Sequence, residues 1–150
     1  EITMPSLVLG DRQQFHLEEH LHVFLRDNWD HTDPGKDWAI HSEPGEPDAG
    51  YKYQCGVGEM DFLPYHRTKN KWPVIELKRY KSTDKAVVQV LRYMGWVQNE
   101  MLQANEVVEG LIISKSGDDK FVYAVSAVPN LAFMEYEIEF QLTPTKLAKL

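Results

Sequence analysis

The sequence predicts an α/β protein in which helices flank a mixed central β-sheet. Segments 15–28 and 84–103 repeat apolar residues at helical spacing. Segments 58–63 and 73–80 have the composition of strands, and the apolar run 107–114 predicts a buried strand. The expected order along the chain is helix, strands, helix, strand, helix, strand.

Length and composition are those of one globular domain. The chain has 150 residues, and we expect a single domain over 1–150 with 1–14 and 143–150 at its periphery. No apolar run has the length of a membrane span, and no secretory signal is visible. The single cysteine, Cys55, excludes an internal disulfide and suits a reducing, cytoplasmic location.

In the first half of the chain, the helix predicted over 15–28 carries Glu18 on the flank of its apolar stripe. Residues 28–50 are rich in Asp, Pro, Gly and His, which predicts mostly loop around a short strand at 38–40. Residues 51–55 then alternate as a strand does.

In the second half, Ser82-Thr83-Asp84 is a helix-start signal, and the helix is expected to run to about Gln103. Gln89 and Tyr93 lie four residues apart beside its main apolar stripe. A short helix is expected over 120–127, and the alternation in 131–142 predicts a half-exposed edge strand.

The two central strands carry the candidate chemistry. A turn-like stretch at 67–71 between them suggests a hairpin, in which Asp61 and Glu76 come from neighbouring strands. Glu76 and Lys78 point to the face opposite that of Leu77. Two adjacent carboxylates repel each other unless a divalent cation lies between them, so this pattern predicts a metal site.

Asp61, a spacer and then Glu76-Leu77-Lys78 resemble the PD-(D/E)xK nuclease superfamily, and the Gln89 helix is similar to that of NucS-like endonucleases. The resemblance covers about residues 15–142. It implies a restriction-endonuclease-like core and a metal-dependent endonuclease that hydrolyses DNA phosphodiester bonds.

The resemblance also implies a role for each site residue. Asp61, Glu76, the Leu77 carbonyl and Glu18 would hold Mg²⁺ or Mn²⁺. Lys78 would orient or help to deprotonate the attacking water, and Gln89 would position water or phosphate. Four residues are expected to lie against the nucleic acid. Tyr93 would support the wall of the cleft, and the backbone would be gripped by Arg92, Lys81 and Arg79.

A net charge of −7 is the wrong sign for a protein that grips phosphates, although basic residues gather between 69 and 92. The charge keeps open a non-catalytic interaction module of the same fold within a larger repair or defence protein, and an RNA-directed nuclease is a third hypothesis. NucS-like proteins carry a second, DNA-binding domain, so a homodimer, a partner or an additional domain is expected to supply affinity for DNA.

Each candidate residue also has a plainer interpretation. Asp61 and Glu76 could form surface ion pairs with Lys78 or Arg79, and Gln89 and Tyr93 could mark an ordinary helix flank. The spacing of the three histidines in the first helix could bind zinc, but exposed or capping histidines are favoured because no further Cys or His completes a set. These histidines are His16, His20 and His22.

Overall fold

The computed structural model describes residues 20–66, 70–137, 142 and 144, apart from the side chains of His66, Arg79 and Tyr80. Glu18, His16 and nearly all of the two segments expected to be peripheral therefore lie outside the described residues. The predictions made for them stay predictions.

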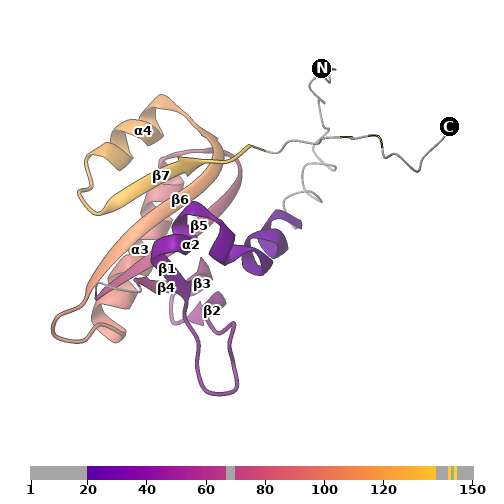
Figure 1. Ribbon diagram of the computed structural model, residues 1–150. Helices are drawn as coiled ribbons and strands as arrows, with labels where there is room; N and C mark the ends of the chain where they lie inside the picture. The colour runs from indigo at the N-terminus through magenta and orange to yellow at the C-terminus, as the bar shows by residue number, and fades with distance from the viewer. Residues whose placement is uncertain (1–19, 67–69, 138–141, 143, 145–150) are drawn as a thin grey trace.

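A five-stranded mixed sheet forms the centre of the molecule (Figure 1). Its strands, in spatial order, are β2 (Tyr51–Cys55), β3 (Gly58–Phe62), β5 (Lys71–Ser82), β6 (Val107–Gly117) and β7 (Leu131–Glu135). β3 is antiparallel to both of its neighbours, β2 and β5, whereas β5, β6 and β7 run parallel to one another. The predicted mixed sheet is confirmed, and β7 is the edge strand that its alternation indicated.

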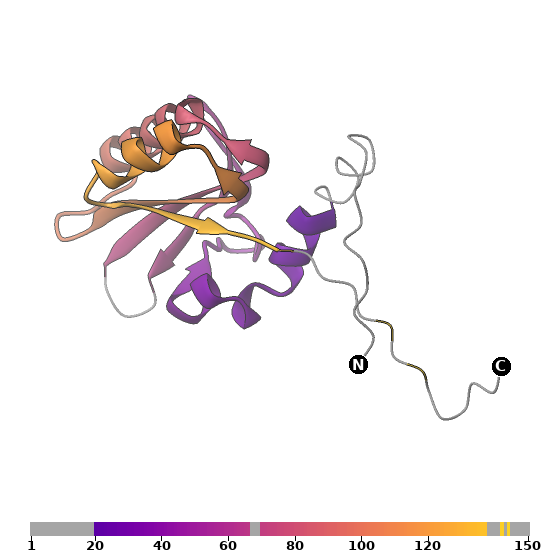
Figure 2. The same cartoon turned by 90° about the horizontal axis from the view of Figure 1, so that it is seen from above.

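Two helices cover one face of this sheet. They are α3 (Asp84–Glu100), which connects β5 to β6, and α4 (Asp119–Ser126), which connects β6 to β7. Figure 2 shows both helices on the same side of the strands. The Asp118 side chain caps α4 by accepting a hydrogen bond from the Phe121 amide at 2.8 Å. None of the helices in the described part of the chain combines the length and the apolar character needed to cross a lipid bilayer.

The core on the helical face is formed by every second residue of the strands and by the apolar side chains of each helix that face the sheet. Val74, Val90, Val97, Ile112 and Phe121 are fully buried there. Burying a side chain of this size stabilises the fold by about 1.5–3 kcal/mol. The alternation in β5 that directs Val74 to this face directs Glu76 to it as well.

The opposite face is covered by the start of the described chain. Residues 20–27 are helical, and η1 (Trp29–His31) and α2 (Asp33–Asp37) follow. Trp29 stacks on Phe62 with ring centroids 5.4 Å apart and donates a hydrogen bond to the Trp38 carbonyl at 2.7 Å. Ile75 and Leu77 of β5 belong to this second core. Helices therefore flank the sheet on both faces, as predicted.

The expectation of mostly loop over 28–50 is wrong for residues 29–37, which form η1 and α2. The sequence Asp33-Pro34-Gly35 resembles a turn, but proline is tolerated in the first turn of a helix because that position has no intrahelical acceptor. Thr32 caps α2 by accepting a hydrogen bond from the Gly35 amide at 3.1 Å. The predicted strand at 38–40 is confirmed as β1 (Trp38–Ile40).

The predicted hairpin is only partly correct. β3 and β5 are antiparallel neighbours, but the chain between them contains β4 (Pro64–His66), which pairs with β1 in a separate two-stranded sheet. Residues 67–69 of the expected turn lie outside the described residues. The long helix ends at Glu100 rather than near Gln103, and the edge strand ends at Glu135.

Candidate active site

Asp61 and Glu76 lie opposite each other on neighbouring strands. The recorded pairing of Phe62 with Ile75 in antiparallel register places Asp61 across from Glu76. The Asp61 amide lies 3.4 Å from Glu76 Oε1, at the long end of hydrogen-bond range. The structure thus brings together the two carboxylates on which the predicted metal site depends.

The Asp61 carboxylate is held at both of its oxygens. Oδ2 accepts a hydrogen bond from the Leu77 amide at 2.7 Å, and Oδ1 lies 3.0 Å from His22 Nε2. Burial acts to raise the pKa of Asp61, but the hydrogen bonds from His22 and the Leu77 amide outweigh it, and the pKa is lowered. Asp61 is therefore the charged member of the pair.

The backbone of Leu77 also faces Asp61. The amide and carbonyl of one residue point to the same side of a strand. Because the Leu77 amide donates to Asp61, the Leu77 carbonyl is directed to that side too. This orientation is the one required for the predicted ligand role of the Leu77 carbonyl.

Glu76 has a different environment. It is only 2% exposed, and Lys78 Nζ lies 3.8 Å from its Oε2. Burial and the charge of Asp61 raise the pKa of Glu76 to about 9, and Lys78 only partly opposes them. Glu76 therefore holds a proton at neutral pH in the absence of a further cation. The alternative of an ion pair with Lys78 is correct as to the partner, but Glu76 is buried, so the pair does not lie at the surface.

Lys78 connects the strand to helix α3. Its Nζ donates a hydrogen bond to Gln89 Oε1, and Gln89 Nε2 lies 3.5 Å from the Tyr93 hydroxyl. Tyr93 is 5% exposed, so in this structure it supports Gln89 from within the core. Gly58 makes room for it, because a Cβ there would lie 2.7 Å from the Tyr93 hydroxyl. Its role toward a nucleic acid stays a prediction.

The predicted basic contacts are less well defined. Lys81 follows the site on β5 and Arg92 lies on α3, and both side chains are exposed. The side chain of Arg79 and all of Glu18 lie outside the described residues. The functional roles of these four residues remain predictions.

His22 is the site residue that the sequence interpretation missed. It was grouped with histidines expected to be exposed, but its side chain is 14% exposed and contacts Asp61. Residues four apart in a helix share a face, so the flank position predicted for Glu18 was also available to His22, one turn later. His20, on the same helix, is exposed as expected.

The donor set suits a hard divalent cation. Carboxylate and carbonyl oxygens are the ligands of Mg²⁺ and Mn²⁺, and Mg²⁺ is commonly held by one or two carboxylates while it keeps several waters. Within the described residues, no group of three or more His, Cys, Asp or Glu side chains is arranged to hold a metal. The oxygen donors of Asp61, Glu76 and Leu77 are of the kind that such an ion takes, and their role as ligands stays a prediction.

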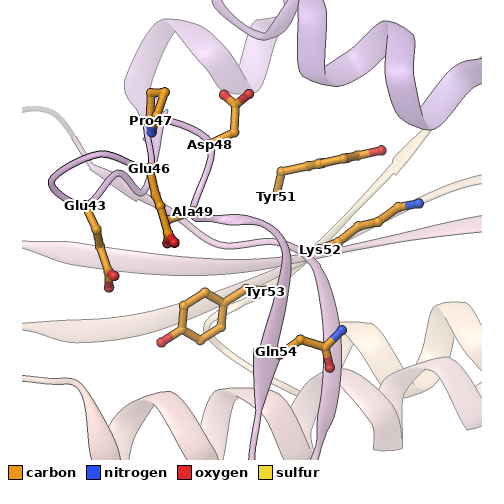
Figure 3. Close-up of a pocket in the computed structure, with 9 residues that line it drawn as sticks. All are labelled: Glu43, Glu46, Pro47, Asp48, Ala49, Tyr51, Lys52, Tyr53 and Gln54. Atoms are coloured by element: carbon orange, nitrogen blue, oxygen red, sulfur yellow. The ribbon is translucent and has the colours of Figure 1, made fainter.

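Figure 3 shows a pocket whose lining includes none of Asp61, Glu76 and Leu77. It lies between the loop before β2 and the strand itself, and Glu43, Glu46 and Asp48 contribute to its lining. Three carboxylates would repel a phosphodiester, so this pocket is not the candidate site.

Comparisons with known proteins agree with this fold. No protein-family model matches the sequence. Endonuclease NucS of Methanocaldococcus jannaschii is 32% identical over 74 residues, which are 49% of this chain and 27% of that protein. The structure of an EndoMS–dsDNA complex superposes with a TM-score of 0.64 and 18% identity, covering 94% of this chain and 51% of that one.

A repair endonuclease from Pyrococcus abyssi superposes with a TM-score of 0.54 and 18% identity over 89% of this chain and 50% of that one. The chain therefore has the α/β nuclease fold of these proteins. Its predicted resemblance to NucS-like endonucleases is confirmed. The chain spans 27% of the length of the NucS relative and about half of the solved structures.

Proposed function

We propose that this chain is the nuclease domain of a divalent-metal-dependent endonuclease that hydrolyses DNA phosphodiester bonds with Mg²⁺ or Mn²⁺. One observation carries the proposal: Asp61 and Glu76 converge from neighbouring strands, and Glu76 is buried without enough positive charge to ionise it. The names of the similar proteins, a NucS endonuclease and a repair endonuclease, support the same reaction class.

Asp61, Glu76 and the Leu77 carbonyl would hold the ion. When bound, it would supply Lewis-acid stabilisation of the charge that develops on the phosphate. Asp61 is already ionised and oriented by two hydrogen bonds. Glu76 would release its proton as it becomes a ligand, because metal ligands must be deprotonated.

Lys78 is placed to act on the attacking water. Its side chain is 29% exposed, so it reaches solvent from beside the buried Glu76. The hydrogen bond to Gln89 fixes the ammonium group and leaves other N–H donors free to hold a water. Its positive charge would also offset the charge of the phosphate.

Contact with DNA would come from exposed basic residues beside the site. Lys81 and Arg92 are exposed on β5 and α3, and Arg79 precedes Lys81 on the same strand. Such contacts grip the phosphate backbone without reading sequence. Because the net charge is −7, further affinity would come from a homodimer, a partner or an additional DNA-binding domain.

The test is cleavage of plasmid, single-stranded, mismatched, flapped and branched DNA with Mg²⁺, Mn²⁺ or EDTA. We expect metal-dependent cleavage that is lost in Asp61→Asn, Glu76→Gln and Lys78→Gln. The matched controls are Glu46→Gln and Lys120→Gln, which change an exposed carboxylate and an exposed lysine on other elements and should cleave as the wild type does. Equal cleavage by all five variants would contradict the proposal.

A second function is favoured by the net charge of −7, which suits a non-catalytic interaction module of the same fold. Calorimetric titration with Mn²⁺ separates the two, since a module of that kind needs no ion at Asp61 and Glu76. RNA substrates in the same cleavage panel test the third hypothesis, an RNA-directed nuclease.

A further inference from the structure

His22 joins the helix on one face of the sheet to the carboxylate at its centre. Its Nε2 lies 3.0 Å from Asp61 Oδ1, and both side chains are mostly buried, at 14% and 19% exposure. The imidazole stacks on Phe62 with centroids 5.1 Å apart and planes inclined by 18°. Tyr51 meets it edge-on at 5.3 Å. The ring is therefore held on two sides while its Nε2 faces Asp61.

The surroundings of the second ring nitrogen of His22, Nδ1, indicate where the imidazole carries a proton. His22 Nδ1 is buried and has no hydrogen-bond partner among the described residues. A proton on Nδ1 would leave a buried N–H without an acceptor among these residues, which costs more than an unused lone pair on nitrogen. Because an ionised carboxylate only accepts hydrogen bonds, the contact with Asp61 also requires a proton on Nε2, which His22 donates.

Two donors thus fix the Asp61 carboxylate. His22 reaches Oδ1 from the neighbouring helix, and the Leu77 amide reaches Oδ2 from β5. A carboxylate oxygen has two lone pairs, so each oxygen retains one for a further contact. These two contacts orient the Asp61 side chain without help from a cation.

We propose that His22 is a positioning residue of this site, which sets the divalent-cation affinity by holding Asp61 through Nε2–H. The inference rests on the proposed function, because it concerns how well the same site binds its ion. Loss of a group that orients a metal ligand typically weakens metal binding by about 10- to 100-fold.

Three substitutions separate the hydrogen bond from the packing. His22→Phe keeps an aromatic ring for the stack on Phe62 but removes the donor, whereas His22→Gln keeps an N–H donor at similar reach and removes the ring. His22→Met matches glutamine in size without the donor, and provides the comparison if the phenylalanine variant does not fold. His20→Ala changes an exposed histidine on the same helix and is the control.

Two measurements on the whole chain form the test: Mn²⁺ affinity by calorimetry, and hydrogen exchange of the Leu77 amide by NMR in EDTA. We expect His22→Phe and His22→Met to bind Mn²⁺ about 10- to 100-fold more weakly. The Leu77 amide, which donates to Asp61, should exchange faster in both variants, while amides elsewhere in the sheet stay unchanged. His22→Gln should remain within a few-fold of the wild type in both measurements, and His20→Ala should match it.

The inference about His22 is wrong if either donor-free variant binds Mn²⁺ as tightly as the wild type. It is also wrong if the Leu77 amide is unaffected, or if glutamine is as damaging as methionine, since packing alone would then explain the loss. In these cases the proposed nuclease function stands, provided that the wild type binds Mn²⁺ and cleaves DNA. A wild type that neither binds Mn²⁺ nor cleaves would overturn both.

Discussion

Replacing Glu76 by glutamine separates the charge of this residue from its shape. Glutamine resembles the protonated acid, and its oxygen can still accept the contact from the Asp61 amide. Without metal, the variant should fold well and should differ from the wild type mainly in how its stability depends on pH. With metal, it should lack a ligand.

The magnitude follows from the pKa of Glu76, which is about 9 in the folded protein against an ordinary value of 4.5. Each pKa unit corresponds to about 1.4 kcal/mol, so ionising Glu76 in the metal-free fold costs at most on the order of 6 kcal/mol. Between these two pH values the folded state binds one more proton than the unfolded state. The contribution of Glu76 to the stability of the wild type is therefore fully present below the unfolded pKa and is lost as pH rises through the folded pKa.

Urea unfolding in EDTA at pH 5.5, 7.0 and 8.5 measures this effect. The difference in unfolding free energy between Glu76→Gln and the wild type should grow in favour of the variant by up to about 1.4 kcal/mol per pH unit. All other titrating groups are common to both proteins, so they largely cancel. Mn²⁺ at 100 times its dissociation constant should then stabilise the wild type alone, by about 2.7 kcal/mol. A difference that does not change with pH would refute the assignment of a protonated Glu76.

Two further predictions concern the lysine and the glycines. Lys78→Gln should lower the rate of DNA cleavage by about 10²- to 10⁴-fold, because Lys78 acts on the attacking water. The Mn²⁺ affinity, measured by calorimetry, should be unchanged or slightly stronger, because Lys78 does not bind the ion. An equal loss of Mn²⁺ affinity would contradict this role. Gly95→Ala should raise the unfolding free energy in urea by about 0.5–1 kcal/mol, because a Cβ there meets nothing within 4 Å in the interior of α3. Gly58→Ala should lower the unfolding free energy by about 1–3 kcal/mol, because Gly58 has φ +139° and lies against the Tyr93 hydroxyl. Similar effects of the two glycine substitutions would be inconsistent with this geometry.

Much of the site could be predicted from local pattern. The alternation of β5 places Glu76 and Lys78 on one face and Leu77 on the other, because successive side chains of a strand point to opposite sides. The helical spacing of Gln89 placed it on a flank near the start of α3, and it contacts Lys78 there. These predictions depend on the geometry of single elements.

Other predictions failed where local pattern was ambiguous. The run Asp33-Pro34-Gly35 fits a turn and also the first turn of a helix, and the helix is accompanied by the Thr32 cap and by the close approach of Gly35 to the Trp29 carbonyl. The strand β4 is three residues long, and only its pairing with β1 makes it a strand. Short segments of this kind acquire their structure from partners that are distant in the sequence.

The sequence by itself determined the order of the long helices and of the strands of the central sheet, the alternation that directs the acid and the lysine of β5 to one face, and the resemblance to a nuclease family. The tertiary structure alone decided that Glu76 is buried, that its pKa rises to about 9, and that His22 contacts Asp61 across 39 positions of the chain. The physical reason is that periodicity is a property of one element, whereas desolvation and contact between side chains depend on how separate elements pack.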